Sequence, residues 1–286
     1  MKMALNRMLL FVGLACLVAQ LLFAGVAAKE EAGVINLIVD MEESALAEGE
    51  SPAEKENLEM NSTINLLNEV DSRDLKATIS VTGDIANERY PLYITMLGTK
   101  ENHELIMGGM SSGEKLVSFE DQDARLRKTR RYVEDDYVCG GKQFKVAGYL
   151  PQPNSFNQSS YKILDDLEIL YLIDDTGLPE SQNRAMPYLM DGFDFYVVPV
   201  SEDKGFLMRD ASAKAAGMNG TDWYNLLASK FDESAGKGET MVVVFTNTIS
   251  GSDEYLDAYK KFVEYATDKG ASFVTTRELV ESAKNA

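Results

Sequence analysis

A short group of acidic residues follows the first strongly apolar segment of the chain. Residues 34–39 are nearly all apolar, and Asp40, Glu42 and Glu43 come directly after them. Such a run is typical of a buried parallel strand, so we expect the carboxylates at its carboxyl end. Paired carboxylates can transfer protons, or split a glycosidic bond when they lie about 5–10 Å apart and one has a raised pKa.

A hard cation is a second kind of chemistry that these carboxylates allow. Asp84, which follows the next predicted strand, can join Asp40, Glu42 and Glu43 as oxygen ligands of an ion such as calcium. Acidic residues are so abundant in the chain that closeness by chance is an equal alternative. Asp40 is also open to a role as the cap of the following turn, and Asp84 is more simply explained as a helix N-cap.

Histidine chemistry is almost absent from the chain. His103 is its only histidine, so no site with several imidazole ligands can form. His103 begins a short predicted strand, where a hydrogen bond to the backbone is its simplest role. Tyr149, Phe156, Tyr161 and Trp223 lie near predicted strand ends and can stack on sugar rings, although core packing is the simpler role of each.

Composition restricts the class of partner. The 286 residues include 28 basic and 46 acidic side chains, which gives a formal net charge of −18. So acidic a surface argues against nucleic acid and anionic membranes as partners. Three Asn-x-Ser/Thr sequons, at Asn61, Asn157 and Asn219, are compatible with export but often arise by chance.

Residues 1–28 are predicted to form a secretory signal peptide. Lys2 and Arg7 precede an apolar run over residues 8–26, and small residues at 26–28 form a cleavage site. An uncleaved anchor is the alternative, because the run approaches the roughly 20 residues that span a membrane. We therefore expect a secreted or cell-surface protein that contacts the membrane only through this segment, with a single folded domain over residues 29–286.

Strand and helix patterns alternate along that domain. Strands are predicted over residues 34–39, 77–81, 104–107, 144–149, 168–173, 193–200, 240–246 and 272–275. Helices are predicted over 60–72, from Asp84 to Gly98, over 113–136 and 159–167, after a cap at Thr221, before Gly270, and after a Thr275–Glu278 capping box. Residues 41–60 are predicted to be a loop. The alternation indicates one parallel α/β domain, best a barrel, with an open doubly wound sheet as the alternative.

Several segments, taken in order, resemble the polysaccharide deacetylase (NodB-homology) family. Residues 40–43 resemble the opening acidic motif of that family, 77–83 its second strand, 102–108 its Gly-His-Glu-Ile-Gly-Asn-His segment, 148–153 its Arg-Pro-Pro region, and 242–248 with 270–275 its closing strands. The match spans nearly the whole mature chain. It implies a distorted (β/α) barrel of seven or eight units.

The resemblance also implies a chemistry, which is the metal-assisted deacetylation of N- or O-acetylated sugars. In that family an Asp and two His hold a divalent ion, a second Asp acts as base and a further His as acid. Asp40 matches the base, and Glu42 or Glu43 lies near the position of the metal-binding Asp. His103 matches a family histidine that does not bind metal.

Four functional positions of the family hold other residues here. The two metal histidines fall at Gly108 and Ser112, the arginine falls at Leu150, and the acid histidine falls near Thr246 or Asn247. Neither glycine nor a neutral serine replaces an imidazole ligand. A divalent metal is expected for the family, but we assign no metal ligand in this chain.

The sequence therefore predicts a divergent, exported member of the family that binds carbohydrate or an envelope glycan without the usual metal-dependent activity. An active hydrolase with a rearranged carboxylate site and a structural component of the cell envelope are the alternatives. The candidate site consists of Asp40 as base equivalent, lined by Glu42, Glu43, Asp84, His103 and Tyr149.

Overall fold

The computed structural model describes residues 32–44, 51–89, 100–134, 145–174, 178, 181 and 184–285. The predicted signal peptide and the predicted helix segment from residue 90 to Gly98 lie outside these ranges. Of the described helices, none is long and apolar enough to cross a membrane.

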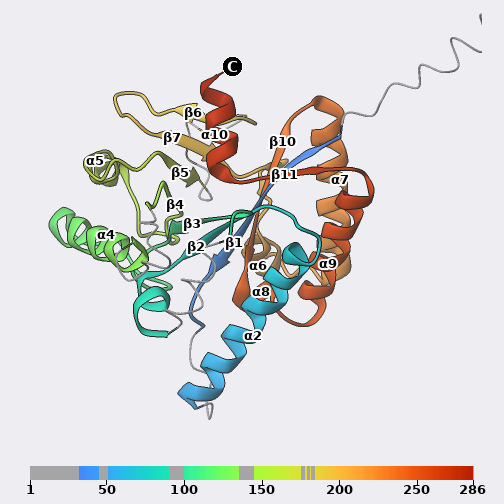
Figure 1. Ribbon diagram of the computed structural model, residues 1–286, viewed down its shortest axis with the longest axis horizontal. Coiled ribbons are helices and arrows are strands. Elements are labelled where there is room, and N and C mark those ends of the chain that lie inside the picture. Colours follow the sequence, from blue (N-terminus) through green and yellow to red (C-terminus); the bar gives the residue numbers. More distant parts are fainter. Residues whose placement is uncertain are drawn as a thin grey trace, which may run out of the picture. The chain divides into compact units, whose positions relative to one another are not determined.

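Nine strands form one sheet in the order β10-β1-β2-β3-β4-β5-β7-β6, with β11 also paired to β1. The sheet curls into an open, distorted barrel, as predicted, and its pairs are parallel except for β6 with β7 (Figure 1). The strands are β1 (Val34–Met41), β2 (Ala77–Val81), β3 (His103–Met107), β4 (Gly148–Tyr149), β5 (Tyr171–Asp174), β6 (Tyr188–Leu189), β7 (Tyr196–Pro199), β10 (Thr240–Thr246) and β11 (Ser272–Val274).

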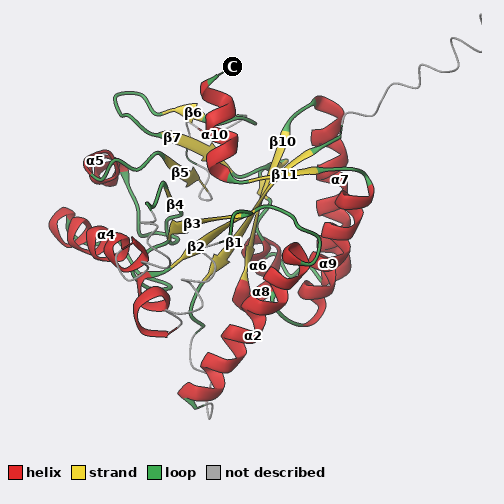
Figure 2. Cartoon of the chain, in the orientation of Figure 1, coloured by secondary structure: helices red, strands yellow, loops and turns green. Residues whose placement is uncertain are grey.

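The helices lie outside the strands (Figure 2). Helices α7 and α9 pack against each other beside β10, α2 packs on α8 and α9, and α4 packs beside β3. The helices are η1 (Ile85–Arg89, a π-helix), α2 (Pro52–Asp71), α4 (Phe119–Glu134), α5 (Gln158–Asp166), α6 (Asp210–Ala215), α7 (Gly220–Lys237), α8 (Asn247–Ser250), α9 (Asp253–Asp268) and α10 (Thr276–Lys284).

Strand β1 lies inside the sheet, which explains its continuous apolar sequence. It pairs with β10 from Val34 to Asp40, and with β2 from Ile38 to Met41. All of its residues after Val34 are buried. A strand with neighbours on both edges and cover on both faces needs apolar side chains at successive positions, and β1 has them up to Asp40 except at Asn36, whose amide donates to Val274 O (3.0 Å).

The predicted loop over residues 41–60 is wrong for residues 52–60, which are the first part of α2. The Ser51 hydroxyl accepts from Glu54 N (3.3 Å), and the Glu54 carboxylate accepts from Ser51 N (2.9 Å). Pro52 fills the first helical position, where an N–H has no intrahelical partner. Pro52 therefore starts this helix instead of preventing it.

Other predicted boundaries shift because of local caps and turns. Helix α4 starts six residues later than the predicted 113, because Gly113 has a left-handed φ of 67° and Ser118 Oγ caps the helix by accepting from Asp121 N (3.2 Å). Asn219, rather than Thr221, caps α7 by accepting from Asp222 N (2.9 Å). The capping box of α10 is confirmed, since Thr275 and Glu278 bond in both directions. The short helices α6 and α8 were not predicted.

A segment without a sequence signal follows β7 and bonds to β10, at the side where the barrel is open. Ser201 N donates to Val242 O (3.0 Å), and Val244 N donates to Met208 O (3.0 Å). Between these contacts a small hairpin projects, formed by β8 (Glu202–Asp203) and β9 (Phe206–Leu207). We call residues 200–209 the seam segment. It places the next residues of the chain beside the carboxyl end of β10.

Candidate functional site

The acidic residues after β1 lie at the carboxyl end of the barrel strands, as expected. Asp40 stands opposite Thr246 of β10 on one side and Ser80 of β2 on the other. The Asp40 side chain is fully buried. In barrels of this kind the carboxyl ends of the strands form the active-site face. We call this end of the barrel the mouth.

Arg209, from the end of the seam segment, joins the two carboxylates of the mouth. Its Nη2 atom lies 3.2 Å from Asp40 Oδ2 and 3.4 Å from Glu42 Oε1. The Arg209 side chain is only 6% exposed. Gln152 Nε2 also donates to Glu42 Oε1 (3.1 Å). A guanidinium with five donors can serve two carboxylates at once, and here it holds them together.

The two carboxylates of this group are not equivalent. Burial raises the pKa of Asp40 well above its ordinary value, and Glu42 raises it further, while Arg209 lowers it. Among the described residues, Asp40 Oδ1 and its strand neighbour Ser80 Oγ are buried and make no hydrogen bond. Burial and a neighbouring carboxylate both favour the neutral form of a carboxyl group, and here they outweigh the opposing effect of Arg209 on Asp40 Oδ2. Asp40 therefore tends to keep its proton beside the more exposed Glu42.

Asp210 fixes the position of Arg209. Its carboxylate accepts from Thr246 N (2.7 Å), Thr246 Oγ1 (3.0 Å) and Ser250 Oγ (2.7 Å). These bonds tie the start of α6 to the end of β10 and to α8. Burial raises the pKa of Asp210 to about 6, and the bonds from Ser250 and Thr246 limit that rise.

Glu43 takes part in a separate, closed group of hydrogen bonds. Its carboxylate accepts from Ser112 N (2.9 Å), from the Ser112 hydroxyl and from Thr82 Oγ1 (2.7 Å), while Glu43 N donates back to Ser112 Oγ (2.7 Å). Asn247 Oδ1 accepts from the backbone N of Glu42 (2.9 Å). The mouth loops after β1 and β3 are thus connected through hydroxyl groups.

Two further predicted residues lie on the same side of the barrel. Tyr149, at the end of β4, is fully buried, and burial raises the pKa of its phenol. Asp84 lies in the helical turn that precedes η1, where its N–H donates to Met110 O (2.9 Å). Thr82, and not Asp84 as predicted, has the capping position, because Thr82 Oγ1 accepts from Ile85 N (3.4 Å). Trp223 is fully buried against Phe245, so its role is core packing and not stacking on a sugar.

The position of His103 differs from the one expected. It is the first residue of β3 and stands opposite Ala77, the first residue of β2. Parallel strands place it at the amino end of the barrel, away from Asp40. Its Nε2 lies 2.8 Å from Asp71 Oδ1, so its partner is a side chain and not the backbone. His103 therefore does not line the mouth.

Arg209, Asp210 and Gln152 were not found from the sequence. Arg209 is 169 positions from Asp40, and no spacing or motif marks it. The one available signal was indirect, since a buried carboxylate at a strand end needs a cationic or donor partner from elsewhere.

Comparison with solved structures gives the same type of fold for each of the proteins described below. The sequence matches no protein-family model and no curated protein. The structure is similar to Puue allantoinase, with a TM-score of 0.71 at 15% identity, covering 88% of this chain and 90% of that one. It is also similar to a probable polysaccharide deacetylase from Pseudomonas aeruginosa PAO1, with a TM-score of 0.70 at 13% identity, covering 88% and 91%.

A third solved structure is a CE4 family pseudoenzyme from Bacillus anthracis. Its TM-score is 0.55 at 13% identity, and the match covers 88% of this chain and 66% of that one. The chain has the polysaccharide deacetylase fold. The fold class and its deacetylase type, predicted from the order of the sequence segments, are confirmed.

The residues of this deacetylase fold do not fit the metal that the resemblance implies. At the expected histidine positions, Gly108 has no side chain and the Ser112 hydroxyl donates to Glu43. A Cβ on Gly108 would lie 3.2 Å from Ser80 Oγ, and one on Gly109 would lie 2.2 Å from Glu114 Oε1. Within the described ranges no three His, Cys, Asp or Glu side chains gather as a metal site.

Proposed function

We propose that this protein is an exported carbohydrate-binding protein of the polysaccharide deacetylase fold that does not perform metal-dependent deacetylation. The position of Arg209 is the main observation that supports this proposal. Its guanidinium lies within 3.4 Å of both Asp40 and Glu42, so an internal cation already pairs with both carboxylates. A divalent ion added there would be repelled by this buried charge.

Carbohydrate is the proposed ligand because of the fold and the predicted export. Two of the similar structures are described as a probable polysaccharide deacetylase and a CE4 family pseudoenzyme. The second is a precedent for this fold without its enzymatic activity. A signal sequence over residues 1–28 would bring the protein to the compartment of envelope glycans.

Acetate release from acetylated oligosaccharides tests the catalytic part of the proposal. The purified protein is assayed with added zinc or cobalt and with a chelator, and circular dichroism confirms that it is folded. We expect no metal-dependent release. Release that the chelator abolishes would overturn the proposal, because it would require metal ligands other than those expected from the resemblance. Glycan arrays at high protein concentration test the binding part, and an absence of binding would remove its support.

An active hydrolase with a carboxylate site is the second candidate, favoured by the unequal pair in the mouth. Asp40, with its raised pKa, could act as the acid and Glu42 as the base. Glycosidases keep their carboxyl groups about 5–10 Å apart with substrate between them. Here Arg209 lies between the two groups, so this reaction requires its movement. Unchanged turnover in Asp40→Asn would refute this candidate.

A further inference from the structure

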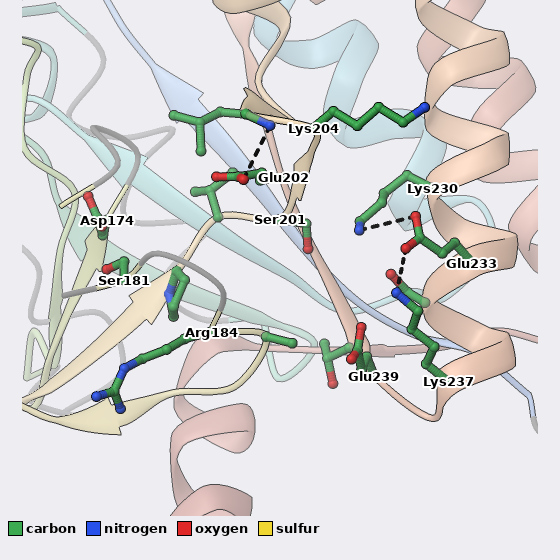
Figure 3. A pocket seen from close by; sticks show the side chains of 17 residues that line it. Asp174, Ser181, Arg184, Ser201, Glu202, Lys204, Lys230, Glu233, Lys237 and Glu239 are labelled. Carbon is green, nitrogen blue, oxygen red and sulfur yellow. Dashed lines mark hydrogen bonds and ion pairs between the residues drawn. The ribbon is translucent and has the colours of Figure 1, made fainter. Parts of the chain in front are cut away.

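A cavity of about 720 Å³ lies beside the seam segment, outside the mouth (Figure 3). One wall is the carboxyl-terminal half of α7, and a second is the β8–β9 hairpin. The third comes from residues at the ends of β5 and β7, and from Ser181, Arg184 and Ala185. Thr240, the first residue of β10, lies at its edge. We call this cavity the seam pocket.

The seam pocket and the mouth are distinct sites. Thr240 borders the pocket and Thr246, six positions later on the same strand, contacts Asp210 in the mouth. At about 3.3 Å per residue these two ends of β10 are about 20 Å apart. No residue that joins the carboxylates of the mouth lines the pocket.

The charges that line the seam pocket balance one another. Four lining residues are basic and four are acidic, in a chain whose formal net charge is −18. They are Arg184, Lys204, Lys230 and Lys237, and Asp174, Glu202, Glu233 and Glu239. A pocket with equal numbers of each sign does not select a strongly charged ligand. It offers both hydrogen-bond donors and acceptors.

Lys230 is the central donor of the pocket. Its side chain is only 11% exposed, whereas lysine is mostly exposed in proteins. Figure 3 shows its ammonium group pointing from α7 toward the space beside Ser201. Its contact with Glu233 is long, at 3.4 Å, and Glu233 also binds Lys237. Lys230 therefore retains donors for a ligand.

Acceptors and apolar groups complete the lining. Glu202 lies across the cavity from α7 and uses one carboxylate oxygen to accept from Gly205 N (3.2 Å). The Ser201 hydroxyl accepts from Val242 N (2.9 Å) and still has a hydrogen to donate. Ala185, Pro199, Val200 and Leu207 supply apolar surface.

We propose that the seam pocket binds a neutral saccharide segment, an inference that rests on the proposed carbohydrate role. Sugar hydroxyl groups both donate and accept, which matches a lining of ammonium, carboxylate and hydroxyl groups. The C–H faces of a pyranose ring match the apolar part. The volume lies in the range of small-molecule sites, about 300–1,000 Å³. On this assignment the saccharide site of the protein is at the seam and not at the mouth.

Binding of short oligosaccharides to the purified protein tests this assignment. Calorimetry and NMR titration would compare the neutral N-acetylglucosamine trimer and xylotriose with trigalacturonate, which is anionic. We expect at least one neutral trimer to bind. Lys230→Gln and Glu202→Gln should each weaken that binding about tenfold, the loss expected for one hydrogen bond to a charged group. Ala185→Trp should abolish it by filling the cavity.

Matched controls separate this inference from the proposed function. Lys260→Gln, at an exposed position of α9, should bind as the wild type does, and so should Gln152→Ala in the mouth. Loss of binding in Gln152→Ala alone would overturn the seam assignment and leave the carbohydrate role intact. Tighter binding of trigalacturonate would overturn the neutral class. No binding of any saccharide would overturn both proposals.

Discussion

The two ends of the barrel each hold a buried carboxylate that faces an arginine, but the two pairs differ in balance. At the amino end, Glu104 accepts from Arg277 N (2.8 Å) and Arg277 Nε (3.2 Å), and the Arg277 side chain is 41% exposed. At the mouth, Arg209 is 6% exposed and serves two carboxylates. At the amino end one arginine pairs with one carboxylate. At the mouth one arginine pairs with two carboxylates, so the acidic groups are in excess there.

The difference lies in the charge balance and the burial of the two ion-paired groups, and not in the presence of buried atoms without partners. Near Glu104, the Thr276 hydroxyl bonds to both Asn36 and Thr78, so these polar residues of β1, β2 and α10 are hydrogen-bonded to one another. Among the described residues, buried polar atoms without a hydrogen-bond partner occur at both ends: Asp40 Oδ1 and Ser80 Oγ at the mouth, and His103 Nδ1 and Tyr171 Oη at the amino end. The excess of carboxylates around a buried arginine is what distinguishes the mouth.

Removing the arginines should give the largest contrast between the two ends. Arg209→Met leaves two acids without their buried cation and should lower the free energy of unfolding by about 4 kcal/mol. Arg277→Met removes a partly exposed partner and should cost about 1 kcal/mol. Urea unfolding at pH 7 measures both losses.

Lys260→Met, at an exposed position of α9, is the control for loss of a positive charge and should change little. Equal losses at the two ends would mean that Arg277 is as essential as Arg209, and the contrast would fail.

The pH dependence of stability should reveal the buried acids near Arg209. The pKa of Asp210 is about 6 in the folded protein, against 3.8 for an ordinary aspartate. Between these values the folded state binds a proton that the unfolded state releases. This contribution therefore makes the protein less stable by roughly 2 kcal/mol as the pH rises from about 4 to 6. Asp40, whose pKa is also raised, acts in the same direction.

Asp210→Asn should remove that contribution. The difference in unfolding free energy between variant and wild type should shift by roughly 2 kcal/mol in favour of the variant between pH 4 and pH 7. Asp257→Asn, at an exposed position of α9, should show no such shift. A pH-independent difference for Asp210→Asn would show that its carboxyl titrates alike in both states.

Asp40→Asn should be nearly neutral for stability, within about 1 kcal/mol at pH 7. Burial favours an uncharged Asp40, and an asparagine amide can donate toward Ser80 while its oxygen accepts from Arg209. Thermal unfolding measures the change. A loss of more than about 2 kcal/mol in the free energy of unfolding would show that the protein needs a charged Asp40. The interpretation that the mouth holds more carboxylates than its arginine can pair with would then be wrong.

The smallest expected effect concerns the Ser112 hydroxyl, at a position where the resemblance led us to expect a histidine. Ser112→Ala removes the hydroxyl bonds with Glu43 but keeps the backbone bond, so it should cost about 1 kcal/mol. Ser111→Ala, one position earlier, serves as the control. If Ser112→Ala changes the free energy of unfolding in urea no more than the control does, the hydrogen bonds between Glu43 and Ser112 do not connect the two mouth loops.

Local chemistry was sufficient to predict much of the fold. The apolar run of β1 predicts a buried strand wherever it is placed, and the Thr275–Glu278 pair predicts a helix start from contacts three residues apart. Because Asp40 comes directly after this run, its position at the carboxyl end of the strand was predicted as well. The start of α2 was missed because Pro52 was interpreted as a loop residue, although Ser51 and Glu54 contained the capping signal.

The sequence by itself determined the strand–helix alternation, the acids after β1 and the absence of histidines at the expected metal positions. Only the tertiary structure decided what those acids contact. Arg209 reaches Asp40 across 169 positions because the seam segment follows β10 to its carboxyl end. Parallel pairing likewise placed His103 at the opposite end from Asp40. Such partners depend on the register and closure of the whole sheet, which no local pattern of residues encodes.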